Sequence, residues 1–97
     1  SIIIVVTYFV KDGGDKMPVH ENIRMIREAK GVSKTFVAKG LGMSLQGYRY
    51  IEDGSVKLDV ERMKVIARLL GEDSAVFLND KLTKSVIDKM NTAVVGA

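Results

Sequence analysis

The spacing of apolar residues changes character near residue 19. Before it, residues 2–10 form an almost unbroken β-branched and aromatic run, which favours a buried or paired strand because branched side chains suit a pleated surface. After it, apolar residues recur every three or four positions, which is typical of amphipathic helices. The pattern predicts a mainly α fold preceded by a short N-terminal β-strand.

The first predicted helix begins near Val19 and ends at Gly31. Its expected inner stripe consists of Ile23, Ile26 and Ala29, with Met25 beside it. Its expected solvent side carries the charged residues Arg24, Arg27, Glu28 and Lys30.

Two short helices follow, and each has a serine at its expected N-cap, where a hydroxyl can accept a bond from an orphan amide. Ser33 begins the earlier one, which we expect to close at Gly40 and Gly42. Its expected inward residues are Phe36, Val37 and Leu41. Ser44 begins the later one, which ends at the turn dipeptide Asp53-Gly54.

The remaining chain predicts one long helix, one short turn and another helix. Asp59 caps the first, whose apolar face comprises Val60, Met63, Ile66, Ala67 and Leu70 before Gly71. A short turn is expected around residues 75–78, and a C-terminal helix over residues 80–91. The inward residues of that helix are expected to be Leu82, Val86, Ile87 and Met90. Residues 92–95 are a candidate second strand, able to pair with residues 2–10.

The two short helices have the spacing of a helix-turn-helix, in which one helix crosses a DNA backbone and the next enters the major groove. With Lys34 counted as first, the small residue needed where the helices meet is Ala38, and the turn glycine is Gly42. The expected apolar positions hold Val37, Leu41, Met43, Tyr48 and Ile51. Every core position of the motif is therefore filled.

The chain resembles the Cro/cI-like, or XRE, regulators, which share the lambda-repressor-like fold of about five helices. The resemblance covers roughly residues 20–78. It rests on the co-linear stretches at residues 23–33, 37–38, 41–44, 51–54 and 66–71. It implies a five-helix DNA-binding domain, to which the sequence adds a C-terminal helix and the N-terminal strand.

The resemblance also implies roles for matching positions. The start of the first short helix would bind a phosphate, and the first residues of the second short helix would contact base edges. The loop after the second helix would bind the DNA backbone. These positions are Lys34, then Ser44, Leu45, Gln46, Arg49 and Tyr50, then Lys57. Gln46 has the chemistry to pair with adenine, and Arg49 can reach guanine or a phosphate.

Several residues depart from the family pattern. Gly47 lies inside the predicted reading helix and costs roughly 1 kcal/mol relative to alanine. Leu45 offers no hydrogen bond, and Tyr48 replaces an aliphatic core residue. Lys34 stands where glutamine is usual, and Asp53 replaces an asparagine that contacts phosphate. Base readout is therefore expected to be sparse.

Charge placement points to a polyanionic partner independently of the resemblance. The chain has a net charge of +3, and residues 30–57 hold five basic residues against two acidic ones, so this region carries the whole excess. Each phosphate that a cation neutralises releases condensed counterions, which favours double-stranded DNA. Because the excess is modest, we expect a homodimer on a pseudo-palindromic site.

The 97 residues suffice for one core, and the absence of cysteine excludes disulfides and thiolate sites. The expected location is the cytoplasm, at the nucleoid when DNA is bound. Residues 1–16 lack the basic start and cleavage pattern of a targeting signal, and their apolar run is too short to span a membrane.

The predicted organisation is an N-terminal strand and linker over residues 1–16, a DNA-binding domain over 17–78, and a C-terminal helix and tail over 79–97. One codon choice for residues 11–17 spells a purine-rich ribosome-binding sequence just before an ATG at Met17. Residues 1–16 are therefore also interpreted as an upstream extension of the natural reading frame. Either that strand or the C-terminal helix is a candidate dimer surface.

No pattern indicates an enzyme, a metal, a cofactor or a small-molecule ligand. His20 has no other possible metal ligand at a suitable spacing, and the adjacent acidic pairs do not converge as an acid and base would.

The leading hypothesis is a sequence-specific transcriptional regulator, a repressor of prokaryotic, phage or mobile-element type. The alternative is an antitoxin-like or anti-repressor module that binds another protein through Leu45, Tyr48, Tyr50 and the apolar flanks of the chain.

Overall fold

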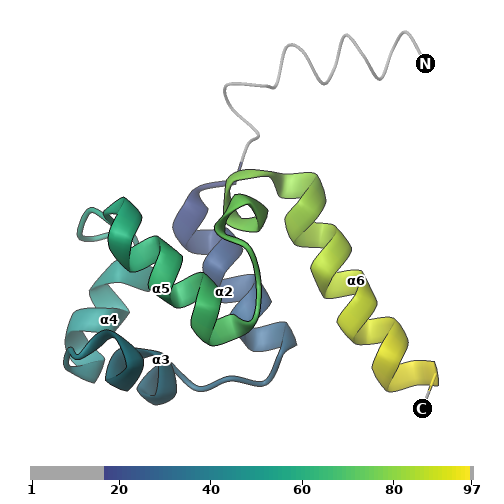
Figure 1. Cartoon of the computed structure of the whole chain (residues 1–97), viewed down its shortest axis with the longest axis horizontal. Helices are drawn as coiled ribbons and strands as arrows, with labels where there is room; N and C mark the ends of the chain where they lie inside the picture. The colour runs from purple at the N-terminus through teal and green to yellow at the C-terminus, as the bar shows by residue number, and fades with distance from the viewer. Residues whose placement is uncertain (1–16, 97) are drawn as a thin grey trace, which may run out of the picture.

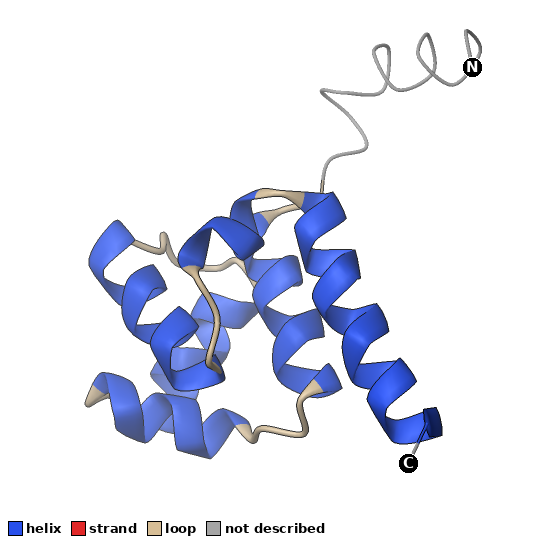
Figure 2. Cartoon of the chain, turned by 45° about the vertical axis from the view of Figure 1, so that its right-hand side comes forward, coloured by secondary structure: helices blue, strands red, loops and turns tan. Residues whose placement is uncertain are grey.

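The computed structural model describes residues 17–96, with side chains described for residues 17–91. The helices are α2 (Val19–Ala29), α3 (Lys34–Leu41), α4 (Leu45–Glu52), α5 (Val60–Leu70) and α6 (Asp80–Gly96), with a 3-10 helix η1 (Ser74–Leu78) before α6. Figure 1 shows α3, α4 and α5 grouped at one end of the molecule and α6 at the other, with α2 between them. Within residues 17–96 there is no strand, as the blue and tan ribbon of Figure 2 shows.

The predicted strand over residues 2–10 lies outside the described residues. The candidate strand over residues 92–95 is wrong, because α6 continues as a helix to Gly96. Nothing in residues 80–96 interrupts the helix, since the chain has no proline or glycine between Asp80 and Gly96. Among the described helices, none is both long and apolar enough to cross a membrane.

The helix ends follow the local signals in the sequence. The hydroxyls of Ser33 and Ser44 and the carboxylate of Asp59 each accept a hydrogen bond from the backbone N–H three residues later, at 2.7 to 3.0 Å. Gly42 and Gly71 end α3 and α5 in the left-handed conformation, which glycine adopts without steric cost. The predicted starts of α3, α4 and α5 are thus confirmed.

One core connects all the helices that precede α6. Its buried members are Ile23, Ile26, Val37, Ala38, Tyr48, Ile51, Met63, Ile66, Ala67, Leu70 and Phe77. Val86 and Ile87 of α6 pack against it from the side of α2 and η1. This core holds α4 rigidly against α3 and leaves one face of α4 uncovered.

Three apolar residues expected inside are exposed instead. Phe36, Val60 and Leu82 each lie in the first turn of their helix, where the chain has only just reached the core. Gly40 does not close α3 either, because it lies inside the helix, where Leu69 of α5 packs directly over it. A side chain at residue 40 would therefore force the Leu69 side chain out of its present position.

Polar contacts fix the beginning of α2 to the end of the domain. The buried Asn22 side chain donates to the Phe77 carbonyl at 2.9 Å and to the Asp80 carboxylate at 3.0 Å. The backbone N–H of Met17 donates to the same carboxylate at 2.9 Å. The Thr83 hydroxyl donates to the Val76 carbonyl at 2.6 Å. These bonds seat α6 on α2 and η1.

Candidate nucleic-acid interface

The turn between α3 and α4 sets the angle at which α4 is presented. Gly42 has φ +69°, and the Met43 N–H donates to the Ala38 carbonyl at 3.0 Å. Ala38 is buried, so the two helices approach closely at this small side chain. The turn and the close approach predicted from the sequence are therefore confirmed.

The two sides of α4 differ sharply in exposure. Tyr48, Ile51 and Glu52 are buried against the core. Gln46, Arg49 and Tyr50 are exposed on the opposite side, while Leu45 is half-buried and the capping residue Ser44 is exposed. The first N–H groups of a helix have no partner within the helix, so the exposed start of α4 offers donors beside these side chains. The five predicted α4 residues therefore share one helix and its cap.

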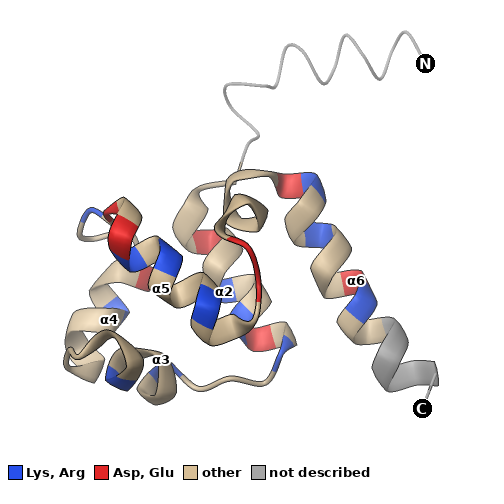
Figure 3. Cartoon of the chain, viewed as in Figure 1, with Lys and Arg blue, Asp and Glu red and all other residues tan. Residues whose placement is uncertain are grey.

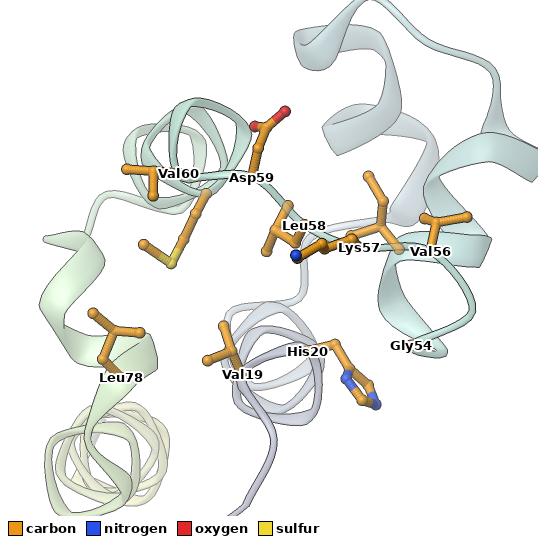
Figure 4. Close-up of a pocket in the computed structure, with 11 residues that line it drawn as sticks. Val19, His20, Gly54, Val56, Lys57, Leu58, Asp59, Val60 and Leu78 are labelled. Atoms are coloured by element: carbon orange, nitrogen blue, oxygen red, sulfur yellow. The ribbon is translucent and has the colours of Figure 1, made fainter.

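Lys34 and Lys57 flank α4 along the chain. Lys34 is the first residue of α3, at a helix N-terminus, where a phosphate is favoured by both the backbone donors and the helix dipole. Figure 3 shows basic positions on α3, on α4 and in the loop after α4, at the end of the molecule away from α6. Lys57, in that loop, is one of the residues that line an apolar pocket, and Figure 4 shows its side chain there with that of Leu58.

A buried ion pair at the end of α4 was missed by the sequence reasoning. The Arg27 guanidinium donates to both carboxylate oxygens of Glu52, from Nε at 2.7 Å and from Nη2 at 2.9 Å. Its Nη1 donates to the Val32 carbonyl at 2.8 Å. The hydrogen bond with Glu52 raises the pKa of Arg27 despite the opposing effect of burial. Arg27 therefore does not lie on the solvent side of α2, and its spacing of four from Ile23 was the available signal.

The ion pair changes the charge balance at the proposed reading surface. Glu52 is one of the two acidic residues in region 30–57, and its charge is neutralised by Arg27 from outside that region. Lys30 is paired as well, with Glu72 at 2.7 Å. The charges left facing solvent around α3 and α4 are mainly those of Lys34, Lys39, Arg49 and Asp53.

Tyr48 lies beside this pair with a buried hydroxyl. Burial raises the pKa of Tyr48 most, and the neighbouring Glu52 carboxylate raises it further. Within the described part of the chain, the hydroxyl has no hydrogen-bond partner of good geometry. Tyr48 is thus a core residue, as its helical spacing predicted, and it is not available to a ligand.

Asp53 keeps a negative charge at the surface where α4 ends. Its Oδ1 accepts the Ser55 N–H at 2.8 Å, and the hydrogen bonds from Ser55 lower the pKa of Asp53. Gly54 follows with φ +82°, and the His20 ring lies where a Cβ on residue 54 would stand. The chain therefore turns sharply away from α4 at this point.

The sequence model of the helix-turn-helix family, HTH_3, matches residues 23–77, which is more than half of the chain. The protein belongs to this family. No curated protein and no solved structure matches it.

The matched region contains α3 and α4, the turn between them and the ion pair that holds α4 in place. Membership makes the protein a DNA-binding helix-turn-helix regulator of the XRE type. The family is regulatory rather than enzymatic. Among residues 17–96, no group of three histidine or acidic side chains is arranged to hold a metal ion.

Proposed function

We propose that the protein is a sequence-specific transcriptional repressor of prokaryotic, phage or mobile-element type. It acts as a homodimer in the cytoplasm, bound to its operator at the nucleoid. Residues 17–78 form the DNA-binding unit, and residues 44–52 read the major groove. The observation that carries the proposal is the difference between the two sides of α4. Tyr48 and Ile51 on one side are buried in the core, and Gln46, Arg49 and Tyr50 on the other are exposed to solvent.

Each exposed side chain has a distinct role in the proposal. Gln46, in the first turn of α4, pairs with adenine through its amide, and Arg49 contacts guanine or a phosphate. Tyr50 gives its hydroxyl to a phosphate or stacks on a sugar, and Leu45 touches a thymine methyl. Lys34 and Lys57 hold backbone phosphates, while the cap Ser44 sets the start of the helix.

Selection of bound duplexes from a random pool tests sequence-specific binding directly. We expect one enriched motif with two-fold symmetry. Gln46→Ala should weaken binding to that motif by roughly ten-fold or more, because a good base contact is worth about 1–3 kcal/mol of discrimination. Affinity should fall steeply with salt for the parent chain.

Lys84→Ala is the matched control for charge. Lys84 is exposed on α6, the helix at the opposite end of the molecule from α3 and α4 (Figure 1), so its loss should leave both affinity and salt dependence unchanged. Arg49→Ala removes the same charge from α4 and should reduce both. Failure to select any motif, together with unchanged binding in the Gln46 and Arg49 variants, would contradict the proposal.

The exposed aromatic residues favour a second candidate, a module that binds another protein through the same helices. Phe36 of α3 is 52% exposed and Tyr50 of α4 is 45% exposed. Tyr48 cannot take part, since it is fully buried. This antitoxin-like or anti-repressor hypothesis predicts no salt-dependent affinity for any DNA duplex, so a mobility-shift assay of DNA binding separates the two candidates.

A further inference from the structure

An apolar groove lies between the first turn of α2, the end of α4 with the loop that follows it, the start of α5, and η1. Its volume is about 380 Å³, and its lining includes Val19, Val56, Leu58, Val60, Met63 and Leu78. Figure 4 shows these side chains around one opening, with His20 and Gly54 at one end. The groove is separate from the exposed face of α4.

The rim of this groove concentrates the exposed apolar surface of the described chain. Six large hydrophobic residues between residues 17 and 91 are exposed, and three of them line the groove. Val56 is 44% exposed, Val60 57% and Leu78 48%. Single exposed apolar residues are ordinary, but a cluster around a hollow marks an interaction surface.

The charges at the rim suit a second copy of the same chain. Lys57 and Asp59 have opposite charge, and both line the groove. Under a two-fold axis each surface meets itself, so Lys57 of one copy can face the partner's Asp59 twice. A purely acidic or purely basic partner would leave one of these charges facing its own sign.

We propose that this groove is the self-association surface of the protein, with Val60 and Leu78 of one copy packing into the groove of the other. The inference rests on the proposed function, because a repressor with few base contacts needs two copies on DNA. Lys57 then lies between the dimer surface and the DNA backbone. The lining of the groove includes Ile51 of α4 and the loop residues from Gly54 onward, so pairing there ties the two reading helices together.

The apolar stripe of α6 is less suited to this role. Val86 and Ile87 already pack against the core of their own chain and Met90 is half-buried, so Leu82 is the one fully exposed member of the four. This single residue supplies an internal control. Leu82 matches Leu78 in residue type and nearly in exposure, but it does not line the groove.

Sedimentation velocity of the full chain without DNA tests the proposal. The parent should show a concentration-dependent dimer. Val60→Glu and Leu78→Glu should each raise the dissociation constant by about ten-fold or more, because a carboxylate would be desolvated at the apolar contact. Leu82→Glu should leave it unchanged. A chain that stays monomeric, or an equal effect of all three variants, would overturn the proposal and leave the groove to a different occupant.

A charge exchange gives a positive result that misfolding cannot imitate. Lys57→Asp and Asp59→Lys should each lose self-association through repulsion, and an equimolar mixture should regain it as a heterodimer with both pairs restored. Asp59 also caps α5, so circular dichroism must show that the Asp59→Lys chain remains folded. Folded variants that fail to pair when mixed would overturn the assignment.

DNA binding is measured separately on a single half-site. The Val60→Glu chain should retain the half-site affinity of the parent and lose the added affinity for the complete site. A chain that binds the half-site but never dimerises overturns the inference and the homodimer in the proposed function, while leaving sequence-specific DNA binding by residues 44–52 intact. Loss of half-site binding in the parent would count against the proposed function instead.

Discussion

The Arg27 guanidinium and the Glu52 carboxylate form a buried two-point ion pair that joins the middle of α2 to the last residue of α4. Both side chains are less than a tenth exposed. The pair therefore fixes the end of the proposed reading helix against the rest of the domain. It also removes a negative charge from the side of the molecule that we expect to meet DNA.

Breaking this pair from one side should destabilise the fold strongly. Glu52→Gln and Arg27→Met should each lower the free energy of unfolding by about 3–5 kcal/mol, since each leaves the charge of the other residue buried without an opposite charge beside it. Urea denaturation measures the loss. Replacing both residues by apolar ones, as in Arg27→Met with Glu52→Leu, should recover much of it. A double variant as unstable as the sum of the two single variants would contradict this account.

Stability should fall at high pH because of Tyr48. Its folded pKa is raised above the unfolded value of about 10, so the stability linked to its proton is fully present below that pH and is lost as the pH rises further. In that range the group should contribute a decline of about 1.4 kcal/mol per pH unit. Tyr48→Phe should remove this part of the decline.

Tyr50→Phe is the matched control, because Tyr50 is exposed on the same helix. It should leave the alkaline decline unchanged. At neutral pH Tyr48→Phe should alter the free energy of unfolding by no more than about 1 kcal/mol, since the hydroxyl it removes has no well-formed hydrogen bond within the described residues. Equal alkaline profiles for the two variants would count against the raised pKa.

The helix starts and the core of the motif could be predicted from sequence because their causes are local. Ser33, Ser44 and Asp59 each cap a helix through a residue three positions later, and Ala38 and Gly42 are required by the turn itself. The HTH_3 match over residues 23–77 agrees with the family resemblance of roughly residues 20–78. The roles of Lys34, Ser44, Leu45, Gln46, Arg49, Tyr50 and Lys57 remain predictions.

What sequence could not supply depends on contacts between distant residues. Arg27 looked solvent-facing by its charge, and its partner Glu52 is 25 positions away. Gly40 looked like a helix end, whereas its role is set by Leu69 on another helix. The exposure of Phe36, Val60 and Leu82 depends on where each helix first meets the core, which apolar periodicity does not specify.

Removing the charge of Asp53 should strengthen DNA binding. Hydrogen bonds from Ser55 lower the pKa of Asp53, so it remains ionised at neutral pH beside the proposed phosphate contacts. Asp53→Asn keeps an oxygen that can accept from Ser55 and should raise affinity by roughly three-fold or more at low salt, with less effect at high salt. Asp88→Asn, an exposed change on α6, should have no effect in the same mobility-shift assay.

Two glycines within helices should respond to alanine in opposite ways. At Gly47 a Cβ would lie 3.1 Å from the Met43 Cε, the end of a flexible, half-exposed side chain, and 3.2 Å from the Ser44 Oγ, so both atoms need to give by only a few tenths of an ångström. Gly47→Ala should therefore stabilise the protein by up to about 1 kcal/mol through helix propensity. At Gly40 a Cβ would lie 2.5 Å from a Leu69 methyl group, so Gly40→Ala should destabilise by about 1–3 kcal/mol. Thermal unfolding that shifts both variants in the same direction would refute this contrast.

A chain that begins at Met17 should gain an ion pair at Asp80. In the structure the Met17 nitrogen donates to Asp80 Oδ2 at 2.9 Å as a neutral amide. In a chain starting there, the same nitrogen is a charged amino group, so Coulomb attraction to the Asp80 carboxylate is added to the hydrogen bond. Asp80→Asn should therefore cost more in the chain over residues 17–97 than in the chain over residues 1–97.

The substitution changes the other interactions of Asp80, including its bond from Asn22, in the same way in both backgrounds, so the difference between the two costs isolates the amino group. Urea denaturation of the four chains at neutral pH measures it. Acetylation of the amino group in the shorter chain should abolish the extra cost. If Asp80→Asn costs the same in both backgrounds, the Met17 nitrogen does not pair with Asp80 as a charged group.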